Sequence, residues 1–354
     1  MENKKRNINL DLIRCVAVFG VVCVHFFINT GFYDEIVIGK RMALSSAMRT
    51  FFMYCVPLFI LLTGYLMNSK KISRSYYKGI LHTIGIYIIS SMFCIIYKSI
   101  VLNGGISFLY CIKEILNFSG APYSWYIEMY IGLFLLIPFL NIVYWNLRTK
   151  QEKHALLLSM FVVIVLPTVG NIFGIKLIPE WWKHIWPFFY YFVGCYIREY
   201  SIRIPTLLNV FFIVGIWIFN SIFNILKSYN SVFEWGAYND WYGWENVTLS
   251  IALFLFLVNL KIDKIPECMK YCIMKISKIS LGIYLCSWIA DDYVYYKISI
   301  VAAGKSIGLE WFPVAVGAVF VISAIFSLLG ELIYEVFVNI CRKIKDRKLV
   351  KDIY

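Results

Sequence analysis

Residues 10–30 read LDLIRCVAVFGVVCVHFFINT, and this stretch decides the class of fold. It is almost entirely apolar and has the length of about 20 residues that an α-helix needs to cross the hydrocarbon core of a bilayer. Lys4, Lys5 and Arg6 precede it, as basic residues precede a signal peptide, but the run is too long and has no evident small-residue cleavage site. We therefore expect an uncleaved first transmembrane helix.

The composition of the whole chain agrees with a membrane protein. Of 354 residues, 60% are hydrophobic and 16% are charged, which is more apolar surface than a soluble domain of this length can bury. The net charge of +13 comes from short basic clusters between apolar runs, which indicates loops rather than a nucleic-acid-binding surface. The ten cysteines have neither Cys-x-x-Cys spacing nor histidine partners, so we expect no disulfide framework and no metal site.

Ten segments are candidates to span a bilayer, and the sixth and eighth are short. They are approximately residues 10–30, 48–67, 80–101, 123–145, 154–171, 184–200, 205–226, 246–261, 279–298 and 312–340. With the N-terminus inside, the inner segments hold 23 Lys and Arg and the outer segments hold 10, with Arg14 left inside the first span. Since cytoplasmic loops carry the basic excess, we expect an all-α bundle of about ten helices, both termini cytoplasmic, forming one domain over residues 1–354.

Charged residues within the first span are costly in a membrane, so Asp11, Arg14 and His25 are candidates for function. Arg14 and His25 are eleven residues apart, which is about 1,100° of helix rotation and therefore within roughly 20° of three full turns. They share one face and are separated by about 16 Å along the axis. Ala17 and Val21 lie between them on this face. We call this face the Arg14–His25 stripe; a narrow ligand could lie along it.

The two ends of the stripe suit different chemistry. The guanidinium of Arg14, near the cytoplasmic entrance, presents a planar fork of donors that can clamp a phosphate or pyrophosphate. The alternative is an Arg that reaches the interface and pairs with Asp11, and both can hold. A neutral imidazole at His25, in the outer half, can take a proton from a hydroxyl or accept an acyl group. A buried structural histidine is the alternative.

At these positions the sequence resembles the acyltransferase family 3 membrane proteins, which O-acylate surface glycans. The stretch RCVAVFGVVCVH, from Arg14 to His25, resembles the family's R-x2-A-x3-V-x3-H signature. Four further segments are similar to family motifs in order and spacing: VPLFILLTGYL (56–66), SWYIEMYIGLFLLIP (124–138), FFYYFVGCY (188–196) and SKISLGIYL (277–285). The resemblance covers nearly the whole chain.

The resemblance implies an acyl-coenzyme A donor, usually acetyl-coenzyme A, as substrate, with no permanently bound cofactor. It implies that Arg14 binds the donor's phosphates, helped by Arg74 and Lys78 of a cytoplasmic loop, and that His25 is at the acyl centre. The pattern departs from the family at Ser287, where a His is common, and at Thr63, where Ser is usual. A second polar catalytic contact is therefore missing or replaced.

Other acidic residues lie near the ends of the predicted spans. Glu128, at a depth comparable to His25, could orient the imidazole or activate an acceptor hydroxyl, or it could be a rim acid at the interface. Asp291 and Asp292 could mark only the boundary of the ninth span. Glu331 and Glu335, four residues apart near the inner end of the last span, are expected to pair with basic loop residues.

Two outer segments are more than connectors. Residues 106–118 have apolar positions at helical spacing and predict an interfacial or re-entrant helix. Residues 229–245 interleave aromatic rings with acids, which is typical of a sugar-binding surface, although an aromatic belt at the headgroups is the alternative. We expect Trp125, Trp241 and Trp244 to contact the acceptor.

Together these features predict a multi-pass enzyme of the bacterial cytoplasmic membrane that O-acetylates an extracytoplasmic glycan or lipid-linked saccharide. Its partners would be acyl-coenzyme A, the acceptor and the lipid bilayer, with no nucleic acid and an oligomeric state that the sequence leaves open. The first alternative is a transporter whose Arg14–His25 stripe lines a path for an amino acid or anion, for which the sequence lacks matched halves with broken helices. The second is a non-catalytic scaffold, which would leave the aligned Arg14 and His25 unexplained.

Overall fold

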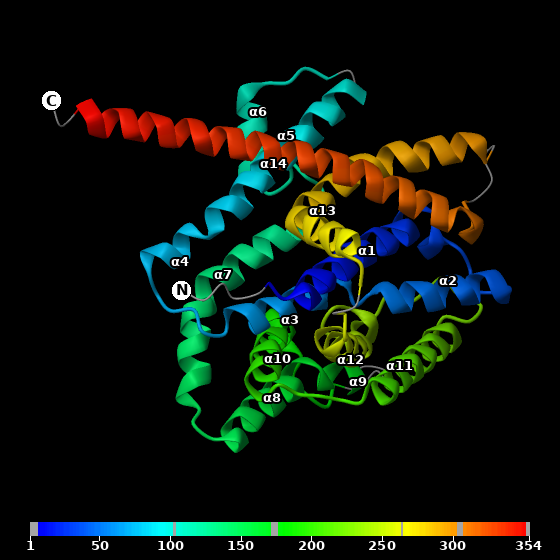
Figure 1. Ribbon diagram of the computed structural model, residues 1–354. Coiled ribbons are helices and arrows are strands. Elements are labelled where there is room, and N and C mark those ends of the chain that lie inside the picture. Colours follow the sequence, from blue (N-terminus) through cyan, green and yellow to red (C-terminus); the bar gives the residue numbers. More distant parts are fainter. Residues whose placement is uncertain (1–5, 102–103, 171–175, 263–264, 303–306, 352–354) are drawn as a thin grey trace.

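The protein is a bundle of helices, shown in Figure 1 as a computed structural model that describes residues 6–101, 104–170, 176–262, 265–302 and 307–351. Side chains are described as far as Ile344, and Lys4 and Lys5 lie outside the described residues. Within these ranges the elements are helices and no strand is present. The predicted all-α class is therefore confirmed.

Nine helical segments of the described chain are long and apolar enough to cross a membrane. They are α1 Ile8–Asn29, α2 with α3 (Gly39–Phe52, Cys55–Met67), α4 with α5 (Arg74–Lys78, Ile80–Val101), α7 Trp125–Asn146, α8 with α9 (Lys150–Ile164, Leu166–Gly170), α11 Thr206–Lys227, η4 with α12 (Ala237–Asn239, Trp244–Asn259), α13 Glu267–Val301 and η5 with α14 (Leu309–Trp311, Phe312–Lys351), the last counted as far as Ile344. The short helix α6 Phe108–Leu116 falls within the segment for which the sequence predicts an interfacial helix.

The sixth predicted span, 184–200, corresponds to helix α10 Trp186–Tyr200, which at 15 residues is shorter than the other nine segments. It is inside the bundle and packs closely on α3. Glycines allow this approach: a Cβ built on Gly64 would lie 2.0 Å from the carbonyl oxygen of Tyr191, and one on Gly194 would lie 2.2 Å from that of Leu61. Small residues that let two helix backbones meet are typical of membrane interfaces.

Helix α1 lies in the middle of the bundle and packs against α13 on one side and α3 on another. Asn7 caps its first turn, because its side chain accepts a hydrogen bond from the backbone of Asn9. The amide of Asn9 in turn donates to the carbonyl oxygens of Leu257 and Leu260 at the end of α12. We call the end where α1 begins the inner end of the bundle, and the end where α1 finishes the outer end.

The predicted topology can be tested with native cysteines, because three exposed ones lie toward the inner end: Cys268 and Cys272 on α13 and Cys341 on α14. A membrane-impermeant maleimide added to intact spheroplasts should leave these three unlabelled until the membrane is permeabilised. Ser231→Cys, at an exposed position of the outer segment, should be labelled without permeabilisation. Labelling of the native cysteines in intact spheroplasts would contradict cytoplasmic termini.

Candidate functional site

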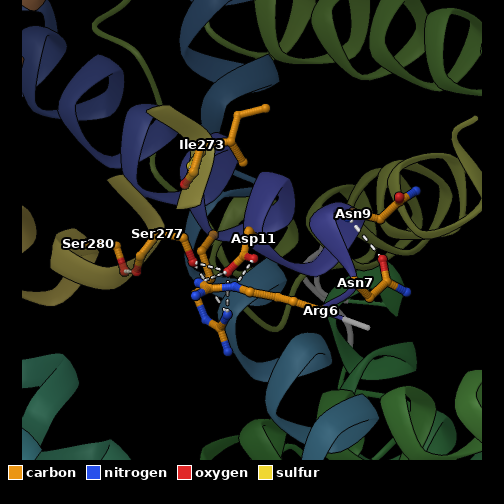
Figure 2. A network of polar contacts seen from close by, with 9 residues as sticks. Arg6, Asn7, Asn9, Asp11, Ile273, Ser277 and Ser280 are labelled. Carbon is orange, nitrogen blue, oxygen red and sulfur yellow. Dashed lines mark hydrogen bonds and ion pairs between the residues drawn. The ribbon is translucent and has the colours of Figure 1, made fainter. Parts of the chain in front are cut away.

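At the inner end, the buried carboxylate of Asp11 organises a polar network between α1 and α13 (Figure 2). Arg6 donates to it through Nε at 2.6 Å and through a terminal nitrogen at 2.8 Å. Ser277 of α13 donates its hydroxyl to the same carboxylate at 2.6 Å. The hydrogen bonds to Asp11 raise the pKa of the Arg6 guanidinium above its ordinary value. Asp11 is therefore neutralised mainly by Arg6.

Arg14 is only loosely held by this network. Its terminal nitrogen lies 3.4 Å from Asp11 Oδ1 and 3.4 Å from the Ser277 hydroxyl, which are long contacts. The side chain keeps 32% of its surface exposed. The predicted Arg14–Asp11 pair is confirmed, but because Arg6 supplies the short contacts to Asp11, most of the Arg14 donor fork is available to a ligand.

Arg14 lines a cavity of about 540 Å³ that opens at the inner end. Three other basic side chains line this cavity, contributed by three different elements: Lys70 from the loop after α3, His82 from α5 and Lys278 from α13. An anionic ligand that entered here would meet these side chains together with Arg14. We call this space the donor cavity.

Two of these basic side chains are paired with carboxylates of α14. His82 Nε2 lies 3.2 Å from Glu331, and Lys278 Nζ lies 2.8 Å from Glu335. The predicted pairing of Glu331 and Glu335 with basic residues is therefore confirmed, although the partners lie on helices rather than in loops.

Away from Arg14, the lining of the donor cavity is largely apolar and aromatic. Val21 of the stripe lines it, and Tyr126 and Tyr284 line it from α7 and α13. The hydroxyl of Tyr284 donates to the backbone carbonyl of Tyr123. The ring of Tyr123 lies 3.9 Å, centroid to centroid, from the imidazole of His25. A layer of tyrosines thus stands between the cavity and His25.

At the outer end, His25 is almost fully buried and its Nδ1 faces two acceptors of α13. Nδ1 lies 3.2 Å from a carboxylate oxygen of Asp291 and 3.4 Å from the hydroxyl of Ser287. The Ser287 hydroxyl donates to the carbonyl of Tyr284 at 2.8 Å, so its oxygen is left to accept. These contacts assign the proton to Nδ1, which leaves the lone pair on Nε2 as a base.

The Asp291 carboxylate has a second donor that fixes its position. The Tyr123 hydroxyl donates to the same Asp291 oxygen at 2.9 Å. Burial, followed by the neighbouring Asp291 carboxylate, raises the pKa of Tyr123 above its ordinary value, so the phenol stays protonated and remains a donor. Asn29, four residues after His25, donates to the His25 carbonyl at 2.8 Å and contacts the same phenol at 3.4 Å. His25 is therefore held by a carboxylate–histidine contact, which fixes the orientation and the tautomer of the imidazole.

Two of the sequence-predicted assignments differ from the structure, one at His25 and one at the donor cavity. Glu128 is exposed on α7, and the described residues contain no hydrogen bond or ion pair between it and His25. The expectation that Glu128 orients the imidazole is corrected, since Asp291 occupies that position; a role for Glu128 in activating the acceptor stays a prediction. Arg74 and Lys78 are exposed on α4 and do not line the donor cavity, where Lys70 is the loop cation.

The structure brings two of the three predicted acceptor-contacting tryptophans together. Trp125 and Trp241 stack with ring centroids 6.0 Å apart, and Trp125 follows Tyr123 by two residues. Trp244 instead packs against Phe219 and Phe223 between α11 and α12. Trp244 therefore packs in the contact between α11 and α12 and is partly exposed, and its contact with the acceptor stays a prediction.

From the sequence, Asp291 reads as a residue at the boundary of a span, and the structure instead places it against His25. A signal was present, because Ser277, Tyr284 and Asp291 recur at seven-residue intervals and so lie on one face of α13. Asp11 and His25 are 14 residues apart, as are their respective contacts Ser277 and Asp291. This equal spacing is what two parallel helices in contact produce.

A family model described as an acyltransferase domain, Acyl_transf_3, matches residues 7–329. The match includes both ends of the Arg14–His25 stripe and the α13 residues that contact them. No curated protein and no solved structure matches the chain.

Proposed function

The chain belongs to the acyltransferase 3 family, and from this premise we propose that it moves an acetyl group from cytosolic acetyl-coenzyme A to a hydroxyl of an extracytoplasmic glycan. The proposed location is the cytoplasmic membrane of a bacterium. Family membership favours an enzyme over the transporter and the scaffold as alternatives. The chain is thus a multi-pass membrane acyltransferase, and the donor and acceptor are the proposed part.

One observation carries the proposal: the donor cavity leads from a basic mouth at the inner end toward a base at the outer end. Arg14 and His25 are about 16 Å apart along α1, and a thioester on a long flexible arm could reach across that distance with its phosphates at Arg14. Lys70 adds a cationic side chain to this mouth, and His82 and Lys278, which pair with Glu331 and Glu335, complete its polar lining. The tyrosine layer would have to move aside for the thioester to reach His25.

The proposed reaction is a direct acyl transfer. Nε2 of His25 accepts the proton of the acceptor hydroxyl as the hydroxyl oxygen attacks the thioester carbonyl carbon. The carbon–sulfur bond breaks, the sulfur leaves with the bonding pair, and the imidazolium returns the proton to it, so coenzyme A departs as a thiol. Asp291 stabilises the transient imidazolium and holds its Nδ1–H in place.

On the outer side, the stacked Trp125 and Trp241 are the proposed surface for a sugar ring of the acceptor. Indole faces bind the apolar faces of sugars. Trp125 follows Tyr123 by two residues, and the ring of Tyr123 lies against the imidazole of His25, which supports placing the acceptor hydroxyl near Nε2.

The direct test is transfer of label. Purified protein is incubated with acetyl-coenzyme A that carries a labelled acetyl group and with cell-envelope glycans separated by class. Label should appear as base-labile ester on one class of glycan. Label that stays on coenzyme A with every glycan, from protein shown to bind the donor, would contradict the proposed acceptor class.

The tryptophan pair gives a second test. Trp241→Ala should raise the KM for the acceptor about fivefold, because a lost aromatic contact costs about 1 kcal/mol. The KM for acetyl-coenzyme A should be unchanged. Trp181→Ala, which removes an exposed outer tryptophan, is the matched control and should change neither constant. If Trp241→Ala leaves the acceptor KM at the parent value, the pair belongs to the aromatic belt alone.

A further inference from the structure

A second open cavity of about 630 Å³ lies at the inner end, between the loop after α3 and the last turns of α7. Its lining includes Lys70 and Lys71 on one side and Ile142 and Trp145 on the other. Lys70 also lines the donor cavity, so the two spaces adjoin at this side chain. We call the second space the loop cavity.

The walls of the loop cavity are fixed by hydrogen bonds rather than left to loop motion. The buried amide of Asn141 donates to the backbone carbonyls of Met67 and Lys70, at 2.8 Å each. The indole nitrogen of Trp145 donates to the carbonyl of Asn68 at 2.5 Å. These bonds tie α7 to the residues that end α3 and begin the loop, and they hold the cavity open between them.

Trp145 presents an aromatic surface to this space. The Nζ of Lys153 lies 4.9 Å from its ring centroid, so this ammonium contacts part of the ring. The residue still keeps 46% of its surface exposed and lines the loop cavity. The indole of Trp145 is anchored by the hydrogen bond from its own nitrogen, and Lys70 and Lys71 line the other side of the loop cavity. An aromatic face opposite two lysines suits a flat heterocycle that carries a phosphate.

We propose, resting on the proposed function, that the loop cavity binds the nucleotide end of the acyl-coenzyme A donor. The adenine ring stacks on Trp145, and the Lys71 ammonium binds the phosphate on the 3′ position of the ribose. Lys70, at the junction of the two cavities, contacts the diphosphate that links the nucleotide to the arm in the donor cavity. The donor therefore bends around Lys70, and the loop cavity gives the protein its specificity for the nucleotide end of the donor.

Binding of coenzyme A and of dephospho-coenzyme A, which lacks the 3′-phosphate, tests both contacts. Titration calorimetry on the purified full chain should show Trp145→Ala weakening both ligands by roughly tenfold or more, as expected for a lost base–aromatic stack. Trp145→Phe should recover most of that loss. Lys71→Ala should weaken coenzyme A alone and abolish its advantage over dephospho-coenzyme A. Trp182→Ala and Lys150→Ala, which change residues outside both cavities, should bind as the parent does.

A phosphate at Lys71 could also come from an anionic lipid headgroup, so the titrations are repeated in neutral phosphatidylcholine nanodiscs with and without phosphatidylglycerol. The proposal expects the Lys71→Ala defect in neutral lipid. A defect that appears only with phosphatidylglycerol would assign the phosphate to lipid and overturn the proposal. Parent-like binding by both Trp145→Ala and Lys71→Ala would also overturn it, whereas a parent protein that binds no coenzyme A would overturn the proposed function itself.

Discussion

Replacing His25 by alanine is expected to reduce the turnover number for acetyl transfer by roughly 10²–10⁴-fold, the usual contribution of general acid–base catalysis. The dissociation constant for acetyl-coenzyme A should stay nearly unchanged, because His25 does not line the donor cavity. The turnover number is measured with labelled acetyl-coenzyme A, and affinity by calorimetry. Parent-like donor affinity also shows that the variant is folded. A variant that binds the donor and transfers acetyl at the parent rate would contradict the proposed mechanism.

Replacing Asp291, which contacts His25, is expected to give a smaller loss of turnover than replacing His25 itself. Asp291→Asn keeps the size of the side chain but removes the charge that stabilises the imidazolium 3.2 Å away. A roughly 10–100-fold loss in turnover is expected, as for other residues that orient a functional histidine. Asp292→Asn, which makes the same change at the exposed neighbouring carboxylate, is the matched control and should not reproduce this loss. Equal losses at both positions would show that the effect does not depend on the contact with the imidazole.

Replacing Arg14 by alanine is expected to raise the KM for acetyl-coenzyme A rather than to lower the turnover number. Loss of a charge-assisted clamp costs about 1.5–3 kcal/mol, so the KM for acetyl-coenzyme A should rise about tenfold or more. Turnover at saturating donor should change little. Arg14→Lys should recover only part of the affinity, because a single ammonium cannot reproduce a bidentate fork.

The control for Arg14 is Arg41→Ala, which removes an exposed arginine that pairs with Glu35 on the outer segment. It should leave the donor KM at the parent value. If Arg14→Ala lowers turnover while the donor KM is unchanged, Arg14 acts on the reaction and not on the donor's phosphates, and the assignment of the two ends of the stripe is wrong.

The sequence predicts well what depends on one helix at a time. The apolar run 10–30 is found as α1, and the helical spacing that aligns Arg14 with His25 agrees with their contacts, since both meet α13. Helix α10 shows the limit of hydropathy, because the predicted span 184–200 forms a helix of only 15 residues that packs inside the bundle on α3.

What the sequence could not predict depends on which helices meet. Glu128 and Asp291 lie at similar depths, and spacing along the chain cannot tell which one faces His25. The structure decides it, because α13 packs along α1 and places Asp291 against the imidazole. Trp244 shows the same difficulty, since an aromatic residue beside acids can bind a ligand or pack between two helices. In the structure its ring packs against Phe223.

In the proposed reaction, the donor enters at the inner, Arg14 end of the bundle and the acetyl group leaves at the outer, His25 end. Membrane vesicles from cells that produce the protein test it, with labelled acetyl-coenzyme A, which does not cross membranes, supplied only outside the vesicles. Inverted vesicles, whose cytoplasmic face is outward, should form labelled ester on the glycan enclosed within them, and right-side-out vesicles should form none. Labelling by right-side-out vesicles together with none by inverted vesicles would contradict transfer from the inner end to the outer end.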